Sequence, residues 1–173
     1  MRALLALDLS VKNTGFAVAR PDGTPRFGSH RLPDTGPDVG RLLLAFDQWL
    51  DDLITLEDPA AIVFEAPMLK RGATHIMTAR KLMNLAGHLE YVCARRGVRC
   101  FEEHISTIKK KFAGRGDADK LDMVAVARRW GWNVRSHDEA DACGLWVCGV
   151  MSLAPNHAAR FRLGPMGAAP AAA

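Results

Sequence analysis

The sequence contains no apolar run that approaches the roughly 20 residues needed to cross a lipid bilayer. Its start, MRALLALDLS, is too short an apolar segment for a secretory signal peptide, and it meets an acid too soon. Both features argue against a membrane-bound or secreted protein. We therefore expect a cytoplasmic location.

Cysteine is scarce, and its spacing lacks the patterns of a zinc site. Cys93, Cys100, Cys143 and Cys148 form no C-x-x-C pair, and no paired histidines stand at zinc-finger distances from them. A zinc site is therefore not expected. The four thiols fit reduced side chains in or near a core.

The composition that remains is typical of one soluble globular domain. A chain of 173 residues can bury a core of its own, and 49% of its residues are hydrophobic and 24% charged. The net charge of +4 is a mild excess that favours a polyanionic partner. We expect one domain over residues 1–153. Residues 154–173 are predicted to form a basic and then Ala-, Gly- and Pro-rich tail without fixed structure.

The segment Ala3–Ala19 predicts a β-hairpin with an acid at its turn. Ala3–Leu7 is wholly apolar, which suits a strand covered on both faces, and Asp8 follows it. Ser10–Gly15 has turn chemistry, and Phe16–Ala19 is typical of the returning strand. Asp8 either faces a ligand at the rim of the core or simply ends a strand in solvent.

A second apolar run repeats this pattern, because Ala60–Phe64 is followed by the acid Glu65. Parallel buried strands end along one edge of a sheet, where ligands of open α/β sheets bind. We therefore expect Asp8 and Glu65 to be neighbours. Further strands are predicted at Arg26–His30 and Val98–Glu102.

Apolar residues at helical spacing predict helices around this sheet. The predicted segments are Val39–Ile54, Thr74–Arg96, a short helix capped by Ser106 or Thr107 and ending at Phe112, Ala118–Trp130, and a final helix from Ser136 to about Leu153. Thr74–Arg96 is apolar over more than one stripe. It either lies deep in one fold or presents a second face to another subunit.

The final helix carries two acids near its start. Ser136 and Glu139 form an S-x-x-E capping box, which places Asp138 and Asp141 on one face of the first turn. The helix dipole alone favours such acids, so capping is one explanation for them. If they meet the two strand ends, four carboxylates converge, and their repulsion raises their pKa values unless a cation neutralises them. Oxygen ligands suit Mg²⁺ or Mn²⁺.

Basic side chains gather in two further stretches, which are either solvated faces or surfaces for a nucleic-acid backbone. The acid-free stretch 66–89 contains Lys70, Arg71, Arg80 and Lys81, and the second cluster contains Lys109, Lys110, Lys111 and Arg115, with Lys120 shortly after. Their position around the acids favours a role beside the predicted metal site. His104 and His137, also near that site, are interpreted as structural or solvent-facing.

Four motifs together resemble the RuvC-type Holliday junction resolvases of the RNase H-like superfamily. They are LDLSVKNTGFAV, IVFEAP, IKKKFAGRGDADK and HDEADA, in this order over nearly all of the first 150 residues. The resemblance implies an α/β, RNase H-like fold, with a five-stranded mixed β-sheet flanked by α-helices. It also implies a homodimer that cuts four-way DNA by paired symmetric nicks, through two-metal-ion hydrolysis to a 5′-phosphate and a 3′-hydroxyl.

The resemblance also assigns roles to single residues. Asp8, Glu65, Asp138 and Asp141 match the family's metal-binding carboxylates, expected to hold two Mg²⁺ ions per site, with Mn²⁺ as a substitute. Lys109 and Lys120 match its catalytic lysines, and the helix from Thr74 to Arg96 resembles its dimerisation helix. DNA contacts are expected from Lys12, Met68, Leu69, Lys70, Arg71, Lys110, Lys111 and Arg115.

The chain departs from the family pattern at two places. Leu9 and Ser10 stand where the bacterial enzymes carry Pro-Gly, and Met68 and Leu69 stand where they carry an aromatic wedge. Such differences fit a phage or prophage branch. The alternatives are another RNase H-like nuclease acting on flaps, forks or RNA-containing duplexes, a nucleotide-binding protein of the actin and sugar-kinase type, and a non-catalytic junction-binding module.

Overall fold

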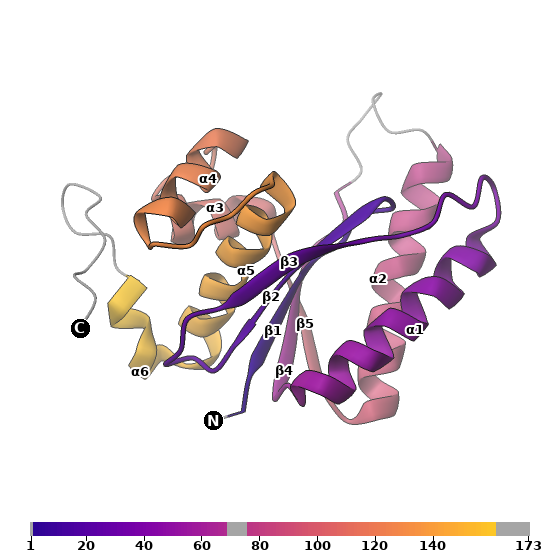
Figure 1. Ribbon diagram of the computed structural model, residues 1–173, viewed down its shortest axis with the longest axis horizontal. Helices are drawn as coiled ribbons and strands as arrows, with labels where there is room; N and C mark the ends of the chain where they lie inside the picture. The colour runs from indigo at the N-terminus through magenta and orange to yellow at the C-terminus, as the bar shows by residue number, and fades with distance from the viewer. Residues whose placement is uncertain (1, 69–75, 162–173) are drawn as a thin grey trace.

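A mixed five-stranded sheet lies at the centre of the molecule (Figure 1). The computed structural model describes residues 2–68 and 76–161. The strands are β1 (Leu4–Asp8), β2 (Asn13–Ala19), β3 (Arg26–Arg31), β4 (Ala61–Glu65) and β5 (Arg99–Glu103), in the order β3-β2-β1-β4-β5. β1 to β3 form an antiparallel meander, and β4 and β5 run parallel to β1. This confirms the predicted sheet.

The central strand β1 is buried on both faces. Leu4 and Ala6 belong to one hydrophobic cluster, and Leu5 and Leu7 belong to another on the opposite side. All four are nearly inaccessible to solvent. A strand that is covered on both faces can place a polar residue only at its end, which explains why the acid follows the apolar run.

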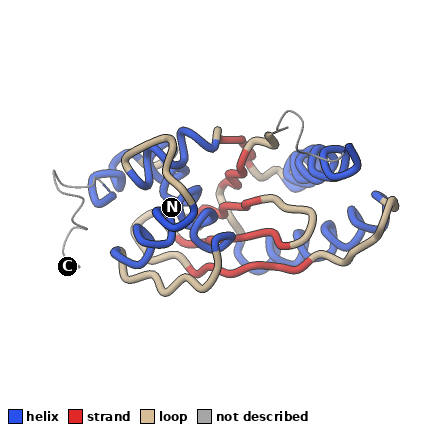
Figure 2. Tube along the Cα trace, turned by 90° about the horizontal axis from the view of Figure 1, so that it is seen from above, coloured by secondary structure: helices blue, strands red, loops and turns tan. Residues whose placement is uncertain are grey.

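Helices cover both faces of the sheet (Figures 1 and 2). α1 (Val39–Glu57) and α2 (Ile76–Arg96) pack together on one face, while α3 (Ile105–Ala113), α4 (Lys120–Arg129) and α5 (His137–Leu153) lie on the other. In the part of the chain that the structure describes, no helix combines the length and apolar character that a membrane span needs. The cytoplasmic location stays a prediction.

Close packing fixes the position of α5 against the sheet. The buried indole of Trp146 donates from Nε1 to the carbonyl oxygen of Leu4 at 3.1 Å. A Cβ atom on Gly149 would lie 2.8 Å from Leu4 Cδ2 and 2.9 Å from Val63 Cγ1, so glycine permits this approach. Because the end of α5 lies on the start of β1, the start of α5 reaches the other end of β1, where Asp8 lies.

Two helices begin at different residues from those predicted. α3 begins at Ile105, because the backbone carbonyl of His104 accepts from the backbone N–H groups of Thr107 and Ile108 at 2.9 and 3.0 Å. Ser106 and Thr107 therefore lie inside the helix and the prediction that one of them caps it is wrong. α4 begins at Lys120 because Asp119 and Asp122 form a reciprocal capping box. The predicted first two residues of α2 lie outside the described residues.

Regular structure continues past the predicted domain boundary at residue 153. α6 (Pro155–Ala158) and a 3₁₀ turn, Ala159–Phe161, follow α5. Phe161 is buried, and its ring centroid lies 5.6 Å from that of Trp146. Residues up to Phe161 therefore pack with the domain instead of forming the tail predicted from residue 154. The rest of that predicted tail, residues 162–173, lies outside the described residues.

Candidate active site

The two acids that follow buried runs lie side by side at the carboxyl ends of two neighbouring parallel strands. β1 and β4 are parallel neighbours whose register pairs Leu7 with Phe64, so Asp8 and Glu65 come next on adjacent strands. Both side chains are partly exposed at this edge. Since each follows an apolar strand, the hydrophobic core holds both carboxylates in place without restricting access from the edge.

Gly15 lets α5 approach Asp8. It is the partner of Asp8 in the antiparallel pairing of β1 with β2. A Cβ atom on Gly15 would lie 2.2 Å from the backbone oxygen of Asp138 and 2.8 Å from its carbonyl carbon, distances that no side chain tolerates. The first turn of α5 therefore rests directly on the backbone of β2, beside Asp8.

Hydrogen bonds at the start of α5 fix the orientation of that turn. Ser136 Oγ accepts from the backbone N–H of Glu139 at 3.2 Å, as the predicted cap requires. The Glu139 carboxylate accepts from the backbone N–H of Arg135 at 2.6 Å and is buried, so Glu139 serves the helix start. Asp138 lies in the first turn and Asp141, three residues later, in the second, because the helix begins at His137.

Asp8 lies within the electric field of all three other predicted acids. Burial raises the pKa of Asp8 well above its usual value, and the charges of Glu65, Asp141 and Asp138 raise this pKa further. The ammonium of Lys120 opposes them. The acids of two strands and one helix therefore act on one carboxyl group, and their role as metal ligands stays a prediction.

Asp141 connects this group to both predicted lysines. Burial raises its pKa, and the charge of Asp138 adds to this rise, whereas Lys120, Lys109 and His137 act to lower the pKa. Lys109 lies on α3 and Lys120 is the first residue of α4. The two lysines thus approach the acids from helices that pack on α5.

The residues of this cluster fit a hard divalent cation. Asp8 lies at the rim of the core among like charges, which is unfavourable until a cation neutralises them, and all four acids offer oxygen donors. Within residues 2–68 and 76–161, no three His, Cys, Asp or Glu side chains are already close enough together to hold a metal ion.

Comparison with known proteins identifies the family. No family model matches the sequence. A curated crossover junction endodeoxyribonuclease RuvC from Corynebacterium jeikeium is 30% identical over 142 residues, which cover 79% of this chain and 83% of that protein. The chain belongs to the RuvC family. RuvC from Halorhodospira halophila is 29% identical over 154 residues, which cover 86% of this chain and 89% of the relative.

Solved RuvC structures share the fold. Thermus thermophilus RuvC in complex with a Holliday junction substrate superposes with a TM-score of 0.74 at 16% identity, covering 91% of this chain and 98% of that one. The yeast mitochondrial Holliday junction resolvase Ydc2 gives a TM-score of 0.58 at 16% identity, with coverages of 92% and 84%. These likenesses confirm the predicted RNase H-like α/β fold class of this RuvC-family chain.

Two of the predicted DNA contacts have partners within the chain. Lys111 Nζ donates to Ser152 Oγ at 2.9 Å and lies 3.8 Å from a carboxylate oxygen of Glu103. Arg115 forms an ion pair with Asp122, whose carboxylate also accepts from the backbone N–H of Asp119, the N-cap of α4. These contacts give both cations a structural role in holding α3 and α4.

The other predicted DNA contacts fall into two groups. Lys12, Met68 and Lys110 are exposed, on the turn after β1, after β4 and on α3 respectively. Leu69, Lys70 and Arg71 lie outside the described residues. Of Met68 and Leu69, which stand where the bacterial enzymes carry an aromatic wedge, the structure therefore describes only Met68.

Sequence reasoning did not assign a role to three further basic residues, Arg31, Arg128 and Arg135, and it placed Lys81 only within a basic stretch. Arg128 and Arg135 line a pocket of about 470 Å³ that also contacts Lys120, His137 and Asp138. Arg31 and Lys81 line a second pocket, of about 430 Å³, together with Lys12. The four-residue spacing of Lys120, Val124 and Arg128 was a usable signal for the first pocket, because it places all three on one face of α4.

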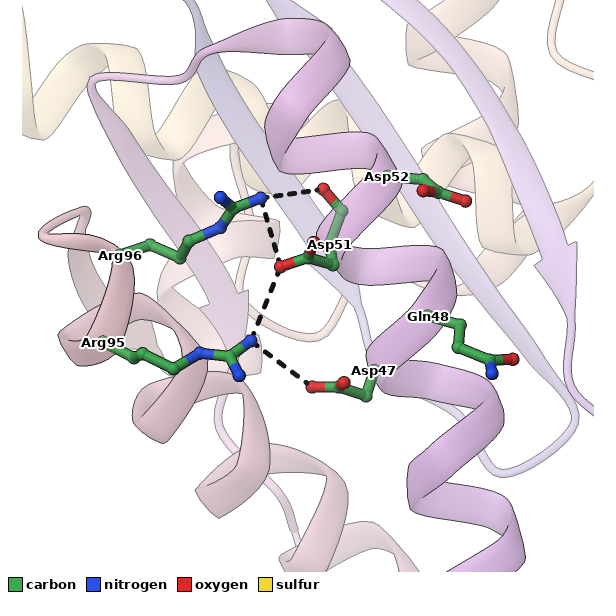
Figure 3. Close-up of a pocket in the computed structure, with 6 residues that line it drawn as sticks. All are labelled: Asp47, Gln48, Asp51, Asp52, Arg95 and Arg96. Atoms are coloured by element: carbon green, nitrogen blue, oxygen red, sulfur yellow. Dashed lines mark hydrogen bonds and ion pairs between the residues drawn. The ribbon is translucent and has the colours of Figure 1, made fainter.

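A third hollow lies between α1 and α2, away from the acids (Figure 3). Arg95 and Arg96 reach from the last turn of α2 toward Asp47 and Asp51 on α1, with Arg96 Nη2 3.1 Å from a carboxylate oxygen of Asp51. α2 ends at this hollow and β5 begins at Arg99. The hollow therefore lies toward the amino-terminal ends of the parallel strands, whereas Asp8 and Glu65 lie at their carboxyl ends. Its ion pairs join the two helices.

Proposed function

We propose that this chain is a divalent-metal-dependent endonuclease that resolves four-way DNA junctions by paired symmetric nicks. The observation that carries the proposal is the convergence of Glu65, Asp138 and Asp141 on Asp8 in a chain of the RuvC family. The names of the relatives support it, since they are crossover junction endodeoxyribonucleases. So does the fold shared with a RuvC that was solved with a Holliday junction substrate.

The chemistry follows from the charges around the edge of the sheet. Mg²⁺, two ions per site with Mn²⁺ as a substitute, would lower the pKa of the attacking water and stabilise charge on the leaving 3′ oxygen. The carboxylates of Asp8, Glu65, Asp138 and Asp141, on β1, β4 and α5, would hold the ions. In-line attack by water then breaks the P–O3′ bond and leaves a 5′-phosphate and a 3′-hydroxyl.

Lys120 and Lys109 act on the phosphate itself. Both charges act to lower the pKa of Asp141, which supports a role for these lysines beside the acids. Lysine acts as a point charge, and a preorganised positive charge stabilises the negative charge that builds on the phosphoryl oxygens during attack. Lys110 and Lys12, both exposed, extend this positive surface for the DNA backbone.

A homodimer through α2 gives the enzyme two such sites. Three large apolar side chains of α2, Ile76, Met83 and Tyr91, are 82%, 51% and 61% exposed. Positions seven and eight residues apart are offset by about 20° and about 80° around a helix, so these side chains lie within one broad stripe. A symmetric pairing of two such stripes would place two active sites in the twofold arrangement of an open four-way junction.

Cleavage of defined DNA substrates tests this function. The purified protein is incubated with an immobile four-way junction labelled on each strand in turn, with Mg²⁺, and the nicks are mapped on all four strands. We expect symmetric nicks in two opposing strands that ligase can reseal, and none with Asp8→Asn. Preferred cleavage of a flap, fork or RNA–DNA hybrid would instead support a different RNase H-like nuclease. Junction binding by a wild type that is inert with Mg²⁺ and Mn²⁺ would support a non-catalytic module.

A further inference from the structure

A basic pocket lies beside the turn that follows Asp8. Its walls come from the turn between β1 and β2, from the loop after β3 and from the first turns of α2, and its volume of about 430 Å³ is large enough for a nucleotide-sized group. Lys12, Arg31 and Lys81 supply its positive charges, and Asp34 is the acid that lines it. A hydrogen bond of 2.7 Å, from the backbone N–H of Leu32 to the carbonyl of Lys12, joins two of these walls.

Lys81 is the feature of this pocket that packing does not explain. Its side chain is only 9% exposed, although it lines the pocket. Among residues 2–68 and 76–161, none forms an ion pair with Lys81, Arg31 or Lys12. The stem of Lys81 is packed, but among the described residues no buried side-chain nitrogen lacks a hydrogen-bond partner, so the unpaired ammonium reaches the open space of the pocket. A cation held at a pocket wall without an ion pair favours an anion as the ligand.

The remaining polar groups favour the same kind of ligand. The side chain of Asp34 accepts from the backbone N–H of Gly36 at 3.1 Å, so this acid is engaged in its own turn. α2, whose first turns line the pocket, has no acid in its first turn, and the positive end of its dipole favours a negative charge. Three cations and a helix start thus surround one space.

We propose that this pocket binds a backbone phosphate of the DNA strand that enters the active site. The inference rests on the proposed nuclease function, because Lys12 stands only four residues after Asp8 and so places the pocket next to the reacting phosphate. A phosphodiester carries one negative charge and two free oxygens, which Arg31 and the ammonium of Lys81 can share. The pocket then fixes the register of the strand on the α2 side of the acids.

Binding measurements with charge-removing variants test the proposal. Lys81→Met keeps the length of the side chain and Arg31→Gln keeps its polarity, and both are made in the full chain. The affinity for a fluorescent four-way junction is measured in EDTA over a range of salt concentrations. We expect each variant to weaken binding roughly 3- to 10-fold and to reduce the slope of log K against log salt by about one, the value for one lost phosphate contact. Lys81→Arg should restore most of the affinity.

Control variants separate this effect from misfolding and from general charge loss. Arg2→Gln removes an exposed arginine that pairs with Asp58 near the opposite end of β1, and it should leave affinity and salt slope unchanged. Lys81→Met removes an unpaired charge and keeps an apolar side chain against the packed surroundings of Lys81, so its melting temperature should equal or exceed that of the wild type. Unchanged junction affinity and slope in both pocket variants would overturn the proposal.

The source of the phosphate is tested separately. Inorganic phosphate and a mononucleotide are titrated against the wild type and Lys81→Met, with the melting temperature as readout. Stabilisation by these small anions that Lys81→Met abolishes, together with unchanged DNA affinity, would indicate a free-anion site and would overturn the DNA assignment. A wild type that binds but does not cut junctions would refute the proposed nuclease function, while a Lys81 effect on binding would still support the phosphate pocket.

Discussion

At the scale of single residues, the environment of Asp8 makes its ionised carboxylate unfavourable unless a positive charge lies beside it. Burial and three neighbouring acids raise its pKa, so the protonated form is favoured in the folded protein relative to the unfolded chain. The folded state is therefore penalised as the pH rises from the unfolded pKa through the folded one. The same carboxylate must be ionised to act as a metal ligand.

Asp8→Asn is expected to abolish cleavage and to stabilise the metal-free protein at neutral pH. Asparagine removes the charge that is unfavourable in the folded state, so urea unfolding in EDTA at pH 7 should show a larger free energy of unfolding for the variant. The gain should shrink as the pH falls toward about 4, where the carboxyl group of the unfolded chain is itself protonated. Mg²⁺ should stabilise the wild type more than the variant. A variant less stable than the wild type at pH 7 in EDTA would contradict this explanation.

The rate of cleavage is expected to rise with pH over the weakly acidic range. Burial raises the pKa values of both Asp8 and Asp141, so these groups lose their protons at higher pH than ordinary aspartates, and only the ionised forms hold a cation. Single-turnover rates with saturating junction and fixed Mg²⁺ measure this. Asp52→Asn, on the exposed side of α1, is the matched control and should leave the profile unchanged. A rate independent of pH between about 5 and 8 would count against the raised values.

The role of a residue could be predicted where a local sequence pattern identifies it. It could not be predicted where only the folded chain brings the residue into a site. Asp8 and Glu65 are marked by the apolar runs before them, and Asp138 by the capping box. Arg31 comes from the end of β3 and Lys81 from α2, segments about fifty residues apart that meet at one pocket only in three dimensions. Burial of Lys81 likewise depends on packing that no local pattern contains.

At the scale of elements, the contact between β2 and α5 positions the acids. Gly15 is buried, and the backbone of Asp138 occupies the space that a side chain there would need. Any added atom must push the start of α5 away from β1. Asp138 and Asp141 would then move away from Asp8 even though no acid has changed.

Gly15→Ala is therefore expected to reduce cleavage strongly and to destabilise the fold by about 1 to 3 kcal/mol, the usual cost of overpacking a core. Junction binding should change little, because the basic residues remain. Gly87→Ala is the matched control: its Cβ meets nothing within 4 Å, and alanine in a helix interior stabilises by up to about 1 kcal/mol. Kinetics and urea unfolding of both variants measure this. Normal activity of Gly15→Ala would show that the close approach is not needed.

Helices and strands could be predicted because the spacing of apolar residues along the chain is regular. The first residue of a helix depends on hydrogen bonds that the sequence does not identify reliably. Serine and threonine are the usual caps, yet His104 begins α3 through its backbone carbonyl alone. Asp122 takes the place of the usual Glu in the box that starts α4. Phe161 extends the domain because its aromatic ring packs on Trp146 from within a segment whose composition suggests a tail.

At the scale of the whole molecule, the exposed stripe of α2 is expected to hold two subunits together. Glutamate in place of Met83 puts a charge at the centre of Ile76, Met83 and Tyr91, and desolvating that charge in a symmetric contact is costly because each subunit contributes one. We expect Met83→Glu to be a monomer in light scattering.

A cruciform plasmid distinguishes the nicking modes, since paired nicks linearise it and single nicks leave an open circle. The variant should produce mainly open circles, because its two active sites are no longer coupled. Leu121→Glu, at a 72% exposed position on α4, should stay dimeric and linearise the plasmid. A dimeric Met83→Glu that still linearises the plasmid would place the subunit contact elsewhere on the molecule.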